Sequence, residues 1–448
     1  MSMERLSAEG YHEGIFGALK EADAEVLELV KREYERLQNK LQLIAAENVC
    51  SRAVLSALGS VIQNKTAEGF PGARMHGGCE VVDEVERLAA ARAKEAFGAK
   101  YVNVQPHSGS QANQIVLTAV LDGGDRILSF GVDQGGHWSH GAAMSFSGKY
   151  FSVENYYVDR TSFLLDYGAI RAKARRFRPK LIICGASVYS RTIDFEKFRE
   201  ITDEVGAYLL ADISHISGLV IAGAHRSPVD WAHFTTTSTY KPGGPRGGLI
   251  VMGRDYDSRI KVGGESLPLW RHIERTTFPG VQGTPYLNHI AAKAIFFKET
   301  ASEEYKARQF KIIENAKALA KALVDLGYDV ITGGTDNHMV LVDVGRLREG
   351  LTGAIAQECL DECGIVTNKN RVPYETKGPD AVSGMRLGTP IVTKNGMRGA
   401  QMEVAAELID AVLRQVQIIS DTEYEIEKPF GKKVRERVKE LCTKFPMR

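Results

Sequence analysis

The chain has 448 residues, a formal net charge of +1, and 44% hydrophobic and 25% charged residues. These proportions are ordinary for a globular protein, and the length predicts two or three domains. The balanced charge argues against a dedicated nucleic-acid binder. We find neither a membrane span nor a secretory signal, so we expect a cytoplasmic protein. The six cysteines, of which only Cys359 and Cys363 lie close together, predict reduced thiols and no metal site.

Helices are predicted near the N-terminus, after a loose arm. Leu27 and Tyr34 belong to an apolar pattern at helical spacing, and Asp23 can cap its start. A second helix is predicted over Asp83–Phe97, with Gly98 as its stop.

The middle of the chain alternates short apolar runs with helical stretches and glycine-rich turns. This pattern is typical of a mostly parallel sheet covered on both faces. The runs are Tyr101–Gln105, Arg126–Phe130, Leu181–Gly185, Ala207–Ala211, Phe234–Thr239 and Gly248–Met252.

From about residue 300, a long amphipathic helix and then shorter strands and helices predict a second, smaller α/β domain. The basic tail, Lys428–Arg448, is expected to form a solvated surface helix. We therefore expect an α/β protein in three parts. These are an N-terminal arm and helices (1–85), a large domain (86–290) and a small C-terminal α/β domain (291–448).

Three polar features point to one cofactor. Ser108–Ser110, the phosphate cup, lies between a predicted strand and a helix, where backbone N–H groups and hydroxyls can bind an anion. Asp212 ends another strand, and Lys241 closes a threonine-rich strand, where loss of hydration would favour the neutral, nucleophilic amine. Separately, these residues could be helix caps and a surface lysine. In this order, they are the three fixed contacts of pyridoxal 5'-phosphate (PLP).

Together with these three features, the sequence resembles the serine hydroxymethyltransferase family over roughly residues 40–420. The resemblance implies a fold-type-I PLP-dependent enzyme whose small-molecule substrate is an amino acid, and a homodimer or larger assembly with shared active sites. The matching stretches are Leu43–Asn48, Glu68–Gly72, Gly77–Glu80, Asn103–Asn113, Gly135–His137, Ser147–Lys149, Ile193–Phe195, His215–Gly218, Gly244–Gly248, Phe278–Gly280, Gly333–His338 and Asn368–Asn370.

The resemblance also implies residue roles at the cofactor. Lys241 would bind the cofactor covalently, Asp212 would pair with its pyridine nitrogen and His137 would stack on its ring. The other cofactor-binding residues would be Ser108, Gly109, Ser110, Ser187, His215 and, reaching in from the partner chain, Gly283.

Two further roles concern the substrate. Arg386 would bind the substrate carboxylate through a forked pair of hydrogen bonds. Glu68, also from the partner chain, would be the acid/base near the substrate side chain. A surface ion pair for Arg386 and a structural role for Glu68 are the alternatives.

Several departures from the family pattern gather at the expected substrate pocket. Thr66 replaces a tyrosine, and Met75 and His76 replace a tyrosine pair. Losing buried hydroxyls would cost roughly 1–3 kcal/mol each, so we interpret these substitutions as specificity determinants. Further departures are Ala46, Gln134, Trp138 and Tyr240; Trp138 is another candidate specificity residue and Tyr240 a candidate substrate contact.

Three functions remain open. The first is a diverged enzyme that acts on an α-amino acid without tetrahydrofolate. Its reaction would be aldol-type Cα–Cβ cleavage, β-elimination, or decarboxylation with oxidative deamination, as in the related enzymes of lincosamide antibiotic pathways. β-Elimination is mildly favoured, because Glu68 could protonate a leaving group and Lys241 could remove the α-proton.

The second function is true serine hydroxymethyltransferase activity with tetrahydrofolate. Glu68 and Asn370 favour it, whereas the departures oppose it. The third is a non-catalytic scaffold, against which Lys241 and Asp212 argue.

Overall fold

The computed structural model describes residues 15–447, and the expected N-terminal arm falls outside them. Two compact units are present. The larger is Ala46–Phe310, and the smaller combines the described residues up to Ala45 with those from Lys311 onward. The segment 1–85 is therefore not one unit. The boundary between the two units at Phe310 and Lys311 falls inside helix α13 (Glu303–Asp325).

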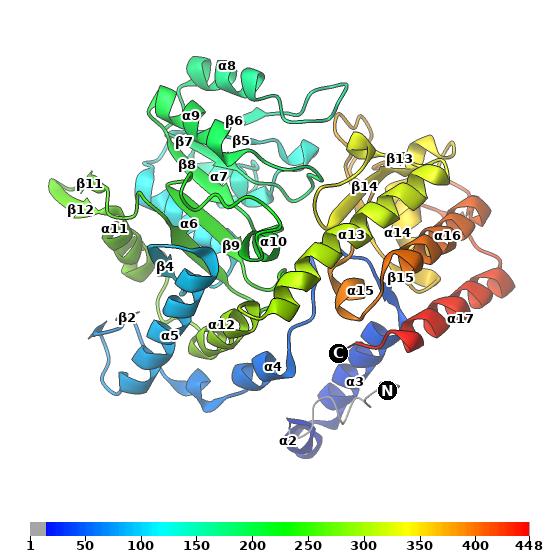
Figure 1. The fold of residues 1–448 in the computed structure, drawn as a ribbon, viewed down its shortest axis with the longest axis horizontal. Helices are drawn as coiled ribbons and strands as arrows, with labels where there is room; N and C mark the ends of the chain where they lie inside the picture. Colours follow the sequence, from blue (N-terminus) through cyan, green and yellow to red (C-terminus); the bar gives the residue numbers. More distant parts are fainter. Residues whose placement is uncertain (1–14, 448) are drawn as a thin grey trace. The chain divides into compact units, whose positions relative to one another are not determined.

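A seven-stranded sheet forms the centre of the larger unit (Figure 1). β10 is antiparallel to both of its neighbours, and all other adjoining strands are parallel. The predicted mostly parallel sheet is thereby confirmed. In spatial order the strands are β4 (Tyr101–Asn103), β10 (Gly248–Met252), β9 (Phe234–Ser238), β8 (Tyr208–Asp212), β7 (Leu181–Cys184), β5 (Arg126–Phe130) and β6 (Ser152–Tyr156).

Both faces of this sheet are covered. Ile182 and Ile183 are adjacent in β7 and point to opposite faces, yet each is 0% exposed. Helix α6 (Gly109–Val120) packs on β9 and β10. Helix α8 (Tyr167–Phe177) packs on β5 and β6, and α9 (Phe195–Val205) packs on β7 and β8. Strand β6 was not predicted, because this edge strand is only partly buried and lacks a continuous apolar run.

The helix predicted over Asp83–Phe97 is α5, which begins slightly earlier, at Glu80, and ends at the left-handed Gly98 (φ 62°). It packs against α12 (Leu287–Thr300), which also contacts α4 (Arg52–Leu58). The remaining elements of the larger unit are β2 (Gly69–Phe70), β3 (Ala73–Arg74), α7 (Phe146–Tyr150), α10 (Ser217–Ile221), β11 (Arg259–Val262), β12 (Glu265–Pro268) and α11 (Leu269–Arg275).

The smaller unit has an antiparallel sheet in the order β13 (Asp329–Val330), β14 (Met339–Asp343), β17 (Gly384–Gly388) and β16 (Asn368–Asn370). A separate parallel pair joins β1 (Leu41–Gln42) to β15 (Ile365–Val366). The described helices here, besides α13, are α2 (Ile15–Ala22), α3 (Ala24–Asn39), α14 (Gly353–Glu362), α15 (Pro390–Lys394), α16 (Gly399–Gln415) and α17 (Lys428–Lys444); β18 (Gln417–Ile418) pairs with β19 (Tyr424–Glu425).

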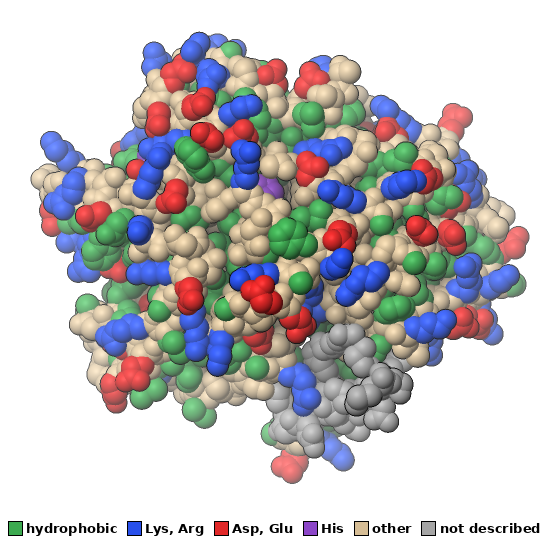
Figure 2. All heavy atoms as spheres, viewed as in Figure 1, with side chains coloured by type: hydrophobic (Ala, Val, Ile, Leu, Met, Phe, Trp, Pro, Cys, Tyr) green, Lys and Arg blue, Asp and Glu red, His purple; other side chains and the backbone are tan. Residues whose placement is uncertain are grey.

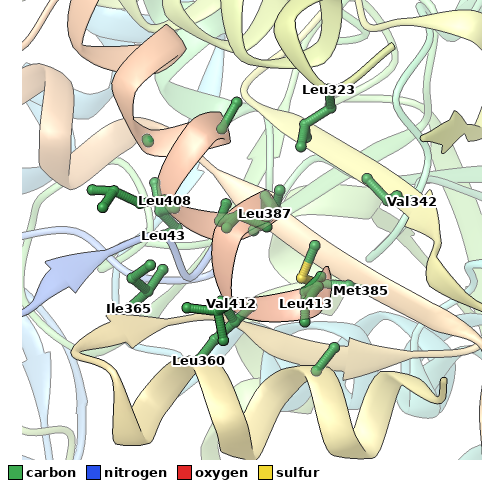
Figure 3. Packing of buried hydrophobic residues seen from close by; sticks show 14 of the residues in the cluster. Leu43, Leu323, Val342, Leu360, Ile365, Met385, Leu387, Leu408, Val412 and Leu413 are labelled. Atoms are coloured by element: carbon green, nitrogen blue, oxygen red, sulfur yellow. The ribbon is translucent and has the colours of Figure 1, made fainter. Parts of the chain in front are cut away.

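One apolar core holds the smaller unit together. Figure 3 shows Leu43 beside Leu408 from α16 and Leu387 from β17, so the start of the chain completes a core made mostly by its end. Tail helix α17 adds Val434 and Val438 to this core. The tail is therefore a helix, as expected, with one face buried.

The described surface has mixed charge. Figure 2 shows acidic and basic side chains interspersed over the visible face. Among the helices between residues 15 and 447, none combines the length and the apolarity needed to cross a bilayer.

Candidate active site

A cavity of about 190 Å³ lies in the larger unit, where several parallel strands end at their carboxyl side. The loops after β4, β7, β8 and β9 all contribute to it. Its lining includes Ser108, Gly109, Ser110, His137, His140, Ser187, Asp212, Ser214, His215, Tyr240, Lys241 and Arg246. Most of the residues predicted to bind the cofactor are thus brought together.

The phosphate cup opens helix α6. Ser108 caps this helix, and its Oγ accepts a hydrogen bond of 3.1 Å from the Gln111 backbone N–H. A Cβ at Gly109 would lie 3.1 Å from the Ser238 nitrogen and 3.2 Å from Ser214 Oγ. This close approach favours glycine. The first turn of a helix also carries N–H groups that have no partner within the helix, and such groups can bind an anion.

Asp212 is buried at the end of β8. One carboxylate oxygen lies 2.9 Å from His140 Nε2 and accepts from Asn113 Nδ2 at 2.8 Å, while the other accepts from the backbone and hydroxyl of Ser214. Burial opposes ionisation, but the hydrogen bond and charge of His140 hold the pKa of Asp212 well below its usual range. The ionised carboxylate is suited to hold a proton on a pyridine nitrogen.

Lys241 is half-buried just beyond β9. Its Nζ donates to Ser238 Oγ at 3.2 Å and lies 4.7 Å from the centroid of the Tyr240 ring. The guanidinium carbon of Arg246 lies 4.0 Å from the centroid of the same ring. Tyr240 therefore contacts two basic side chains that line the cavity, a geometry that holds its ring in place.

His137 presents a neutral ring to the cavity. Burial first, and then the neighbouring His140, lower the pKa of His137 to about 4. Ser139 fixes the imidazole, because its backbone nitrogen donates to Nδ1 at 3.2 Å and its hydroxyl lies 2.8 Å from the same atom. An uncharged, oriented ring is suited to stack on a flat cofactor.

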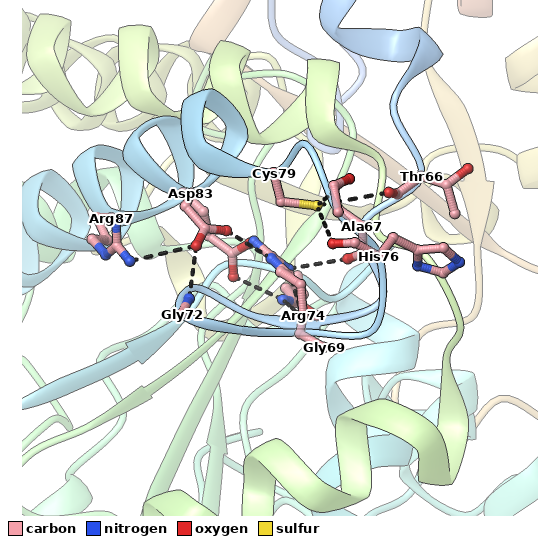
Figure 4. A network of polar contacts seen from close by, with 12 residues as sticks. Thr66, Ala67, Gly69, Gly72, Arg74, His76, Cys79, Asp83 and Arg87 are labelled. Carbon is pink, nitrogen blue, oxygen red and sulfur yellow. Dashed lines mark hydrogen bonds and ion pairs between the residues drawn. The ribbon is translucent and has the colours of Figure 1, made fainter.

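The β2–β3 hairpin that carries Glu68 is clamped by a buried ionic network (Figure 4). The side chain of Arg74 is 4% exposed and donates to the carboxylates of Asp83 and Glu86 at 2.8 and 2.6 Å. The same guanidinium donates to the carbonyls of Ala67 and Gly69, on either side of Glu68 in the chain. Arg74 therefore fixes the backbone that carries Glu68.

Other predicted residues do not line this cavity. Glu68 lies beside Gly283, where a Cβ would approach Glu68 Oε1 to 3.3 Å. Both were expected to reach a partner's cofactor, and the fold places them together. The side chains of Thr66, just before the hairpin, and of Met75 and His76, just after it, are exposed. Arg386 is half-buried on β17 of the smaller unit, where its Nε donates to Asn368.

The sequence analysis did not identify three residues of the Asp212 network: Asn113, His140 and Ser214. Asn113 was noted only as the end of a matching stretch, and His140 was not considered. Asn113 is 0% exposed on the sheet-facing side of α6, and a polar residue among apolar ones on that face was the available signal. For His140, the only signal in the sequence was its position three residues after His137.

The sheet, the phosphate cup, the buried acid and the lysine define the class of protein: a fold-type-I PLP-dependent enzyme. A family model described as "Serine hydroxymethyltransferase" matches residues 19–409. A protein of Methanosarcina barkeri (strain Fusaro / DSM 804) named "Serine hydroxymethyltransferase" is 46% identical over 433 residues, which cover 96% of this chain and 99% of that protein. The chain belongs to the serine hydroxymethyltransferase family, whose enzymes use PLP.

Proposed function

We propose that this protein is a serine hydroxymethyltransferase, which exchanges the hydroxymethyl group of serine with tetrahydrofolate. The near full-length match to a relative of that name favours this activity over the diverged reactions that we favoured from the sequence. The observation that carries the proposal is that Lys241, Asp212 and the phosphate cup line one cavity in a chain so similar to that relative.

The cavity residues take the roles that the resemblance implies. The phosphate cup binds the phosphate, Asp212 keeps a proton on the pyridine nitrogen, and His137 stacks on the ring. Lys241 is the covalent attachment point, and Ser187 and His215 lie near the phenolic oxygen. Bound PLP supplies an electron sink for the bond that breaks at the substrate α-carbon.

Substrate recognition is assigned to residues outside the cavity lining. Arg386 binds the amino-acid carboxylate, because a guanidinium can form two parallel hydrogen bonds with it. Glu68 moves a proton at the serine hydroxyl. Glu68 and Gly283 act in the partner's active site, so the functional unit is at least a homodimer. The sparse, mostly buried cysteines favour a cytoplasmic location.

The test is glycine formation from L-serine and tetrahydrofolate by the PLP-loaded protein. A matched control is Glu68→Gln, which removes the acid but keeps the size of the side chain. We expect this variant to lose turnover and to keep the absorbance of the bound cofactor. If the unmodified protein forms no glycine at any tetrahydrofolate concentration, the proposal is wrong.

A second candidate is a family enzyme with another α-amino acid as its substrate. The replacement of aromatic residues by Thr66, Met75 and His76 favours it. Product analysis with L-threonine and cysteine S-conjugates separates the two candidates. Faster turnover of one of these than of serine would favour the second.

A further inference from the structure

Lys293 is a buried lysine to which none of the roles above is assigned. It lies on α12, is 2% exposed, and donates from Nζ to the backbone carbonyls of Val104, Gly248 and Pro106 at 2.6, 2.9 and 3.3 Å. An ammonium group has three N–H donors, whereas a neutral amine has two. Three carbonyl acceptors therefore match the charged form.

These three carbonyls lie next to the phosphate cup. Val104 and Pro106 lie four and two positions before Ser108. The Gly248 nitrogen donates to the Pro106 carbonyl at 2.8 Å. The lysine thus ties the segment before the cup to the start of β10.

Gly247 lies between the side chain of Lys293 and the cavity. A Cβ at Gly247, which lines the cavity, would lie 2.5 Å from Lys293 Cε and 2.8 Å from Nζ. The charge also acts on the cavity-lining His107, whose pKa is lowered by burial and, next, by Lys293. The positive field of Lys293 therefore reaches the site.

The local protein charge does not neutralise this cation. Among residues 15–447, no carboxylate forms an ion pair with Lys293. Burial lowers the pKa of Lys293 to about 7, and the charge of Glu86 opposes that shift only in part. Glu86 itself is hydrogen-bonded to Arg74 and Gln105. A buried charge without a counterion is costly, so an anion bound nearby would stabilise it.

We propose that Lys293 is a positioning residue for the cofactor phosphate. Its three hydrogen bonds set the shape of the phosphate cup, and its charge attracts the phosphate from behind the cup. This inference rests on the proposed role of the cup, but not on which amino acid is the substrate.

The experiment compares PLP with pyridoxal, which lacks the phosphate but can form the same bond to Lys241. Dissociation constants are measured on the apoprotein by absorbance and fluorescence titration. In Lys293→Met, which keeps the length without donors or charge, we expect PLP to bind about 10- to 100-fold more weakly. Pyridoxal should bind as it does to the unmodified protein. Lys298→Met, at an exposed position of the same helix, is the matched control.

Two further variants separate charge from packing. Lys293→Gln keeps donors but not the charge, and we expect it to lose most of the preference for PLP. Lys293→Ala should regain affinity for PLP with propylammonium chloride, which replaces the missing atoms, but not with tetramethylammonium chloride.

An unchanged preference for PLP over pyridoxal in Lys293→Met or Lys293→Gln would overturn the proposal. If neither variant folds even with saturating PLP, while Lys298→Met folds, Lys293 serves the fold alone and the proposal is equally wrong. Serine turnover is not measured here, so failure of the proposed activity would be recognised separately.

Discussion

Asn113 donates its side-chain amide to Oδ2 of Asp212 over 2.8 Å. Asn113 lies in the second turn of α6, whose first turn holds the phosphate cup, whereas Asp212 ends β8. The amide oxygen of Asn113 in turn accepts from Thr236 Oγ1 at 2.6 Å. One buried side chain therefore fixes the distance between the groups proposed to hold the two ends of the cofactor.

Asn113→Leu should destabilise the apoprotein by about 1–3 kcal/mol, because Asp212 and Thr236 each lose a buried partner. Urea unfolding followed by circular dichroism measures this. Gln114→Leu, at the next, half-buried position, is the matched control and should cost much less. Equal effects of the two substitutions would show that the amide is not important.

Lys241→Ala should lower turnover by roughly three orders of magnitude or more, because it removes the proposed covalent attachment point. Borohydride treatment of the PLP-loaded protein and peptide mapping should find the pyridoxyl group on Lys241. Lys293 provides an internal comparison, since it is buried behind the cup and should carry no label. A label on another lysine would contradict the assignment.

Arg74→Met should cost about 3–5 kcal/mol in unfolding free energy, because the buried carboxylates of Asp83 and Glu86 lose their counterion. Arg87 also contacts Asp83, at 3.4 Å, but its side chain is 57% exposed. Arg87→Met should therefore change stability by less than about 1 kcal/mol. The double variant Arg74→Met, Glu86→Gln should recover part of the loss, and no recovery would argue against pairing with Glu86.

The low pKa of His137 makes stability depend on pH. The folded ring stays neutral down to about pH 4, whereas the unfolded ring gains a proton near pH 6.5. Between these values the unfolded state binds more protons, so this group's contribution to stability falls as pH falls. His140, Asp212 and Lys241 also face the ring.

His137→Phe should flatten the loss of apoprotein stability between pH 6.5 and 4, as measured by urea unfolding at several pH values. An equal slope in both proteins would be evidence that the ring is not held neutral.

Thr66→Tyr combined with Met75→Tyr and His76→Tyr should raise kcat/KM for serine with tetrahydrofolate about tenfold, a difference of about 1.4 kcal/mol. Met75 is 71% exposed in the chain, so the change should cost little stability. Steady-state kinetics tests this, with Met144→Tyr, at a residue 74% exposed, as the control. No gain would contradict our interpretation of these positions as specificity determinants.

The sequence predicted the sheet well because its inner strands are continuous apolar runs. Arg126–Phe130 and Gly248–Met252 were predicted to the residue. Edge strand β6 was not predicted, because only one of its five residues is buried. Lys241, Asp212 and the cup could be predicted because each lies at or just beyond the end of a strand, and parallel strands bring such residues to one edge of the sheet.

Other features of the site depend on contacts between distant residues, which a single sequence does not contain. The Asp212 network joins residues 99 and 72 positions away along the chain. Lys293 looked like an ordinary helix residue, although its carbonyl acceptors precede it by 189, 187 and 45 positions. We predicted three domains that follow one another along the chain. This prediction did not include the pairing of the strand at Leu41–Gln42 with Ile365–Val366, which joins residues far apart in the sequence.

That pairing has a consequence for biosynthesis. β1 is translated before the larger unit and β15 after it, so the smaller unit is interrupted in the sequence by the whole of the larger one. On the ribosome, Ala46–Phe310 can acquire its sheet while Leu41 and Leu43 still lack the residues that will enclose them. The core of the smaller unit can therefore be completed only after the residues beyond the larger unit have been synthesised.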